Sequence, residues 1–137
     1  MRFILDTNIC IYIIKKKPEQ VFDRFKSVAV GDLCISAITF SELQYGVSKS
    51  ASPDRNQAAL TEFLGPINIL DYPAAAAVRY GDIKAQLATR GQIIGPNYLL
   101  IAAHALTLGA VLITNNETEF RRVPGLTVEN WVVKSLE

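Results

Sequence analysis

Acidic and amide side chains occur where runs of apolar residues end in this chain. Asp6 follows the first short apolar run, Glu42 lies shortly after the second, and Thr114–Asn116 follows the fourth. Such runs, bounded by polar residues, are typical of strands buried on both faces of a parallel sheet. Open α/β sheets bind ligands at the carboxyl ends of their strands. We therefore expect these polar side chains to share one edge of a sheet.

Carboxylates that meet at one edge favour a divalent cation between them. Two such charges about 4 Å apart repel by roughly 4 kcal/mol at an effective dielectric near 20. Mg²⁺ and Mn²⁺ prefer oxygen ligands, so a cation at this edge turns the repulsion into binding. A metal held in this way activates water and steadies the leaving oxygen of a phosphodiester. Asp6 and Glu42 therefore suggest metal-dependent hydrolysis of a phosphate ester.

Each acid also has an explanation that involves no chemistry. Asp6, Thr7 and Asn8 are all favoured N-caps for the helix expected after the first strand. Glu42 completes a capping box if Thr39 is the N-cap, whereas with Ser36 as the cap no capping rule explains it. Asn116 and Glu119 have the spacing of a cap-like pair at a short helix. The local sequence leaves these alternatives open.

Strand-like and helix-like segments alternate along the whole chain. The expected strands are 2–5, 33–35, 67–70, 110–113 and 126–128. The expected helices are 7–14, one starting at residue 19, 36–46, 52–64, 74–89, 97–108 and a short one carrying Phe120. The pair Gly95-Pro96 before a helix and Gly109 after it are typical boundary residues. This alternation predicts a three-layer α/β/α sandwich with a mostly parallel central sheet. Trp131 is expected to anchor the end of the chain.

Size and composition fit one globular domain covering residues 1–137. Half of the residues are hydrophobic, one fifth are charged, and the net charge of +1 favours neither nucleic acid nor membrane. The apolar runs fall short of the roughly 18 residues of a membrane span, and an acid interrupts the first one where a signal peptide would continue. Cys10, Cys34 and the lone His104 are expected in the core, which predicts a cytoplasmic protein without a zinc site.

Four sequence motifs, taken in order, resemble the PIN domain and specifically the VapC-type toxins of bacterial toxin–antitoxin pairs. The first is LDTNI at the start of the chain, and the second is ISAITFSELQYG. The third is GP, three further residues and then LIAAHAL, and the fourth is LITNN, followed shortly by EF. The resemblance implies a Mg²⁺- or Mn²⁺-dependent endoribonuclease that cleaves structured RNA, with the anticodon stem-loop of initiator tRNA as the leading target. It also implies a homodimer, inhibition by a VapB-type antitoxin whose carboxyl-terminal segment covers the site, and a larger assembly with operator DNA.

The resemblance also assigns roles to individual residues. Asp6, Glu42 and Asn116 match metal-binding positions of the catalytic set. The residues expected to line the site are Asn8, Thr114, Asn115 and Glu119. Basic residues that could meet the RNA backbone are Lys15, Lys16, Lys17, Lys49, Arg55 and Arg90.

Tyr98 departs from the family pattern, which has an aspartate at this catalytic position. An acid in the first helical turn would be favoured by the helix dipole and would direct a third charge into the cleft. A tyrosine is neutral at pH 7 and bulky, so it must occupy the metal site or turn outward and leave a gap. We expect an inactivated nuclease; the alternatives are a natural variant that uses Asn97 or Glu119, or a non-catalytic module that binds antitoxin or RNA. A phosphatase of the haloacid dehalogenase type is disfavoured because its second acid is replaced by Asn8.

Overall fold

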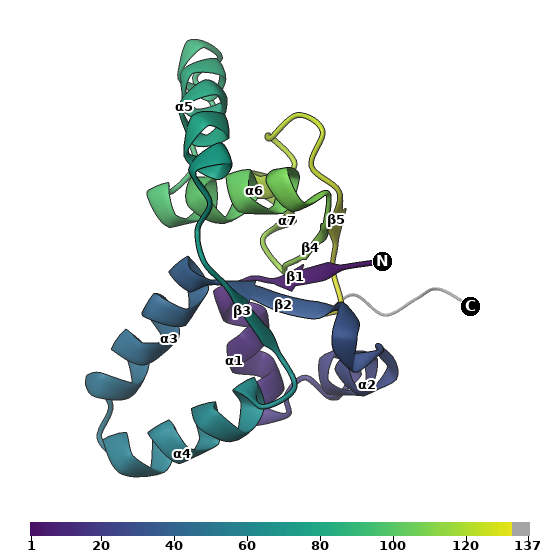
Figure 1. Ribbon diagram of the computed structural model, residues 1–137, viewed down its shortest axis with the longest axis vertical. Helices are drawn as coiled ribbons and strands as arrows, with labels where there is room; N and C mark the ends of the chain where they lie inside the picture. The colour runs from purple at the N-terminus through teal and green to yellow at the C-terminus, as the bar shows by residue number, and fades with distance from the viewer. Residues whose placement is uncertain (133–137) are drawn as a thin grey trace.

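The computed structural model, which describes residues 1–132, has a five-stranded parallel sheet at its centre (Figure 1). The strands are β1 (Phe3–Leu5), β2 (Leu33–Ser36), β3 (Asn68–Leu70), β4 (Val111–Ile113) and β5 (Val128–Glu129). Their order across the sheet is β3-β2-β1-β4-β5, and each adjacent pair runs parallel. The predicted parallel sheet is therefore confirmed, with β1 in the middle.

Helices cover both faces of this sheet. They are α1 (Thr7–Lys15), α2 (Glu19–Ser27), α3 (Ala37–Ser48), α4 (Pro53–Leu64), α5 (Ala74–Thr89), α6 (Pro96–Leu108) and α7 (Glu117–Phe120), with a short 3-10 helix at Val30–Asp32. In Figure 1, α5, α6 and α7 lie above the sheet and α1 to α4 lie below it. The three-layer sandwich predicted from the alternating pattern is confirmed.

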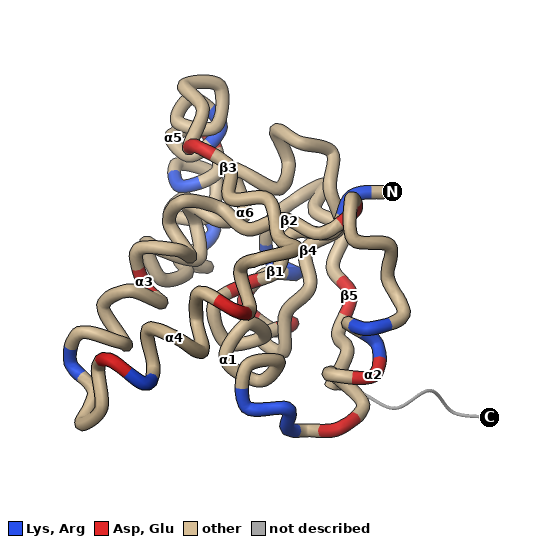
Figure 2. Tube along the Cα trace, turned by 60° about the horizontal axis from the view of Figure 1, so that its bottom comes forward, with Lys and Arg blue, Asp and Glu red and all other residues tan. Residues whose placement is uncertain are grey.

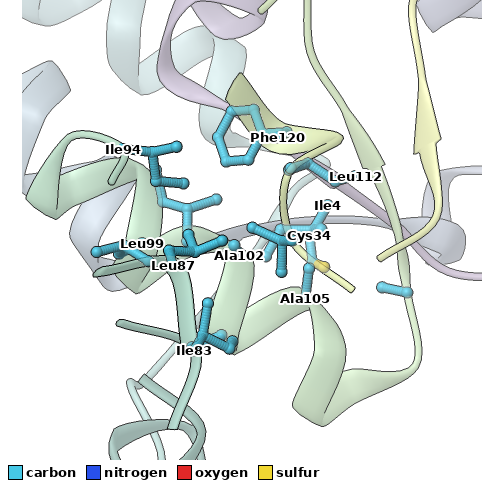
Figure 3. Packing of buried hydrophobic residues seen from close by; sticks show 14 residues of the cluster. Ile4, Cys34, Ile83, Leu87, Ile94, Leu99, Ala102, Ala105, Leu112 and Phe120 are labelled. Carbon is cyan, nitrogen blue, oxygen red and sulfur yellow. The ribbon is translucent and has the colours of Figure 1, made fainter. Parts of the chain in front are cut away.

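The strands bury both of their faces, which divides the core into two clusters. Ile4, Cys34 and Leu112 are in register on neighbouring strands and pack against α5, α6 and Phe120 (Figure 3). The strand residues between them face the other layer, where they join residues of α1 to α4. Successive side chains of a strand point to opposite faces, so each apolar run supplies both clusters. This explains why the runs are continuous rather than alternating.

Two strands are shifted by one or two residues from their predicted bounds, each for a local reason. The last strand is Val128–Glu129 instead of 126–128, because the Leu126 amide donates to the Val123 carbonyl in a turn where Gly125 has a φ of 80°. The third strand begins at Asn68, and Ile67 remains a buried residue of the preceding turn. The other predicted elements are present within two residues of their expected bounds.

The lone histidine and the carboxyl-terminal tryptophan are both buried, as expected. His104 Nδ1 lies 2.8 Å from Ser36 Oγ, its ring meets the edge of Tyr72, and burial lowers the pKa of the imidazole. Trp131 packs on Phe3 with ring centroids 6.1 Å apart, so it anchors the end of β5. Among residues 1–132, no helix is both long enough and apolar enough to cross a membrane.

Candidate active site

Asp6 lies at the carboxyl end of the central strand and has two structural roles. Its backbone amide donates to the Ile113 carbonyl, which ties it to the neighbouring strand β4. Its carboxylate accepts one hydrogen bond from the Ile9 amide at 2.9 Å, as the N-cap of α1, and another from the Thr114 hydroxyl. The cap is therefore Asp6 itself, rather than Thr7 or Asn8. The side chain is almost completely buried, so this acid is fixed before any ligand binds.

The environment of Asp6 disfavours its ionised form. Burial raises the pKa of its carboxyl group from 3.8 to about 6, and the charge of Glu42 contributes to the increase. Hydrogen bonds from Thr114 and Ile9 lower the pKa but do not cancel the effect of burial. A buried carboxylate near a second acid is the arrangement that a cation would relieve.

Glu42 projects from the second turn of α3 toward the amino-terminal turns of two other helices. Ser36 is the N-cap of α3, since its hydroxyl accepts from the Ile38 amide at 3.1 Å, so no capping box is formed with Thr39. The Glu42 carboxylate instead accepts from the Thr7 hydroxyl at Oε1 and from Asn97 Nδ2 at Oε2, the latter at 3.1 Å. The structure thus decides the alternative that the sequence left open.

The segment after β4 forms a polar network that begins at Asp6. Thr114 donates to Asp6 and accepts from the Asn116 amide at 2.9 Å. The Asn116 side chain donates through Nδ2 to Glu119 at 2.7 Å. The two residues therefore pair as predicted, but Asn116 makes no side-chain capping bond to α7. Asn115 is exposed, and its side-chain oxygen accepts from Asn130 at 3.1 Å. Asn8, also predicted to line the site, is exposed on the first turn of α1.

Tyr98 remains at the site and does not turn outward. Its ring meets the buried Phe120 edge-on, with centroids 5.3 Å apart, and a side chain at Gly95 would press on it at 3.2 Å. The pKa of the Tyr98 hydroxyl is raised by burial and by the charges of Glu119, Asp6 and Glu42. The hydroxyl of Tyr98 therefore lies within the electrostatic field of all three acids. A neutral aromatic side chain stands where the third acid was expected.

The donors present suit a hard cation only in part. Within residues 1–132, no group of three or more histidine, cysteine or acidic side chains is arranged to hold a metal ion. Asp6 and Glu42 nevertheless form a pair of oxygen donors, and Mg²⁺ is commonly held by one or two protein carboxylates together with waters and substrate phosphates. The residues thus fit a two-carboxylate site that lacks its third acid.

Two polar residues of the site were not identified as partners of Glu42 from the sequence. The sequence suggests Thr7 only as a helix cap and Asn97 only as a substitute ligand. Their positions in the sequence could have indicated that both residues lie at the site. Thr7 directly follows Asp6, and Asn97 lies in the first turn of the helix that carries Tyr98.

Comparison with known proteins agrees with this fold. The family model of the PIN domain matches residues 3–126, so the chain belongs to the PIN-domain family. Within that family it belongs to the VapC branch, since it is 48% identical to the tRNA(fMet)-specific endonuclease VapC of Shigella flexneri, over 96% of this chain and 98% of that protein. It is also 47% identical to ribonuclease VapC2 of Haemophilus influenzae, over 96% and 99% of the two chains.

Solved structures of the same branch superpose closely on this chain. VapBC2 of Rickettsia felis, bound to a promoter DNA fragment, gives a TM-score of 0.89 at 43% identity, over 96% of this chain and 99% of that one. DNA-bound VapBC of Salmonella typhimurium gives a TM-score of 0.89 at 45% identity, over 96% and 98%.

Proposed function

We propose that this chain is the toxin of a type II VapBC pair, built as a Mg²⁺- or Mn²⁺-dependent endoribonuclease and impaired by Tyr98. The proposed substrate is initiator tRNA, cut in its anticodon stem-loop. The observation that carries the proposal is the convergence of Asp6 and Glu42 from separate segments, with Tyr98 in the position of a third acid. A relative that shares 48% of its residues is a tRNA(fMet)-specific endonuclease, which supports the choice of substrate.

Asp6 and Glu42 are the residues proposed to hold the metal. Bound there, the ion would supply an activated water and stabilise the leaving oxygen of the RNA phosphodiester. The chain's own contribution is to fix the two carboxylates, through Ile9 and Thr114 for Asp6 and through Thr7 and Asn97 for Glu42. Asn116 is proposed as a further ligand through its side-chain oxygen, since only its amide nitrogen is engaged with Glu119.

The contacts of Asn97 and Glu119 argue against either residue replacing the missing acid. A carboxylate only accepts hydrogen bonds, so the atom of Asn97 that faces Glu42 is its NH₂ donor, which cannot bind a cation. Glu119 accepts from the Asn116 side chain, and residues 1–132 contain no three-acid cluster that includes it. These contacts favour impairment over substitution. A protein that binds antitoxin or RNA without cleaving is the second candidate, supported by the same Tyr98.

The direct test is cleavage of initiator tRNA by the Tyr98→Asp variant with Mn²⁺, compared with elongator tRNAs. We expect cuts confined to the anticodon stem-loop of the initiator.

The basic residues named as RNA contacts are all exposed, and Figure 2 shows lysines and arginines spread over several elements rather than collected in one patch. Recognition by RNA shape therefore suits this surface better than one continuous basic groove.

A groove beside Glu42 supports an antitoxin partner. It has a volume of about 270 Å³ and lies between α1, α3 and α4. Its lining is mainly apolar, contributed by Ile11, Ile14, Leu43, Val47, Ala59 and Leu60, with Glu42 and Lys15 among its polar residues. Relatives at 43–45% identity were solved as VapBC complexes. We propose that an apolar segment of a VapB-type antitoxin occupies this groove and thereby reaches the site.

Placing a charge in the groove is expected to release the antitoxin. Ala59 lines the groove on α4, so Ala59→Asp puts a carboxylate against the bound apolar segment, and we expect at least a 100-fold weaker complex. The measurement is co-purification, followed by titration with the antitoxin encoded beside the toxin. The matched control is Ala58→Asp, a neighbouring exposed position on the same helix that does not line the groove. Equal loss in both variants would place the antitoxin elsewhere.

Helix α5 supports the proposed homodimer. It stands outward from α6 in Figure 1, and Val78 on its surface is 68% exposed beside the exposed residues Ala74, Ala75 and Ala77. An uncovered apolar helix face of this kind suits contact with the same face of a second copy. The larger assembly with antitoxin and operator DNA is proposed because the relatives' complexes hold promoter DNA or are DNA-bound.

Breaking this face is expected to give a monomer. Val78→Glu introduces like charges across a symmetric contact, so the mass measured by light scattering after gel filtration should fall from two chains to one. Lys84→Glu, an exposed change on the same helix, is the control and should remain dimeric. A dimeric Val78→Glu protein would exclude α5 as the interface.

A further inference from the structure

Both oxygens of the Glu42 carboxylate are held by neutral donors from other helices. Oε1 accepts from the Thr7 hydroxyl, and Oε2 accepts from Asn97 Nδ2 at 3.1 Å. Glu42 itself is half-buried on α3 and has no cation among these partners. The contacts therefore restrain a side chain that could otherwise turn toward solvent.

The two donors are placed by backbone features that are independent of Glu42. Thr7 is the first residue of α1, directly after Asp6, whose carboxylate caps that helix. Asn97 is in the first turn of α6, next to Pro96 at the start of the helix. The hydrogen bond from Thr7 thus links Glu42 to the segment that carries Asp6, and the hydrogen bond from Asn97 links it to the helix that carries Tyr98.

Restraint is needed because the two acids repel each other. The Thr7 hydroxyl bonds to Glu42 while the neighbouring residue Asp6 caps the same helix, so the two carboxylates lie close enough to repel each other. Asp6 is fixed by its cap and by Thr114, whereas Glu42 would relieve the repulsion by rotating away. The hydroxyl proton of Thr7 goes to the charged acceptor Glu42, because its other neighbour, Thr39, is neutral and lies at 3.5 Å.

We propose that Thr7 and Asn97 are positioning residues that hold the Glu42 carboxylate toward Asp6 in the orientation a divalent cation requires. This inference rests on the proposed metal site. Each carboxylate oxygen has a second lone pair, so both can accept their present donor and still bind a cation. Residues that orient metal ligands in this way typically change metal affinity 10–100-fold when they are removed.

The test is Mn²⁺ affinity, measured by calorimetry on the full chain in the Tyr98→Asp background. Thr7→Val and Asn97→Ala should each bind Mn²⁺ 10–100-fold more weakly, whereas Thr7→Ser, which keeps the hydroxyl, should stay within about threefold of its parent. Gln44→Ala is the matched control, because it removes a side-chain amide from α3 that pairs with Gln57 and not with Glu42. Thermal unfolding without metal checks that Thr7→Val and Thr7→Ser are equally folded.

The outcomes separate the positioning role from the metal site itself. Normal Mn²⁺ affinity in Thr7→Val and Asn97→Ala would overturn the inference and leave the proposed function intact. Weak binding by Thr7→Ser as well as Thr7→Val would also overturn it, because the hydroxyl would then not be the active group. If the Tyr98→Asp parent takes up no Mn²⁺, the proposed metal site fails and the positioning role fails with it.

Discussion

Replacing Tyr98 by aspartate is expected to raise Mn²⁺-dependent cleavage of initiator tRNA at least 100-fold. The aspartate adds a third negative charge in the first turn of α6, where the helix dipole favours it, and it removes the ring that packs on Phe120. Loss of a residue that only supports a metal ligand costs about 10–100-fold, so restoring a direct ligand should gain at least that much. The measurements are single-turnover cleavage and the increase in melting temperature caused by Mn²⁺.

Two further substitutions at residue 98 separate charge from bulk. Tyr98→Asn has nearly the shape of aspartate without its charge, and Tyr98→Phe keeps the ring without the hydroxyl. We expect Tyr98→Phe to remain inactive and Tyr98→Asn to recover far less activity than Tyr98→Asp. Equal rescue by asparagine and aspartate would assign the impairment to bulk alone. No gain with aspartate would exclude position 98 as the cause.

Replacing Asp6 by asparagine is expected to stabilise the metal-free protein while abolishing Mn²⁺ binding. Burial raises the pKa of Asp6 from 3.8 to about 6, a difference that corresponds to about 3 kcal/mol of unfavourable ionisation at neutral pH. Asparagine can still accept from the Ile9 amide and face the Thr114 hydroxyl without the buried charge. We expect the free energy of unfolding at pH 7 to rise by about 2 kcal/mol, measured by urea denaturation in chelator.

The pH dependence of this difference gives a second check. Between about pH 4 and pH 6 the folded chain keeps a proton on Asp6 that the unfolded chain has released, so its stability falls as pH rises through this window. The Asp6→Asn protein lacks this loss, and its advantage should grow from pH 4 to pH 6. His104 acts in the opposite direction because its pKa is lowered, but it is present in both proteins and cancels. Asp71→Asn, at an exposed carboxylate, is the control and should change little.

The buried charge of Asp6 lowers the stability of the folded protein, and the proposed metal site requires that charge. Asp6 is kept as an acid in a position where a neutral isostere would be more stable, as is common for groups that bind ligands. A stabilised Asp6→Asn protein that no longer binds metal would support this view. A destabilised one would mean that Asp6 serves chiefly as the cap of α1.

The sequence by itself determined the layers, the parallel sheet and the set of polar residues at its edge. The continuous apolar runs identified strands buried on both faces, and glycine and proline marked most helix ends within two residues. These signals are local and periodic, so one chain carries them completely. The departure at Tyr98 was also visible from the sequence, because it interrupts a motif of the family.

Only the tertiary structure decided what each polar residue contacts. Ser36 and Thr39 were equally acceptable caps for α3, and the choice of Ser36 left Glu42 free to meet Thr7 and Asn97. These partners are 35 and 55 positions from Glu42 in the sequence, and no local pattern encodes such pairs. The same is true of Tyr98, whose ring stays at the site because it packs on Phe120 from α7, beside Gly95 at the start of its own helix.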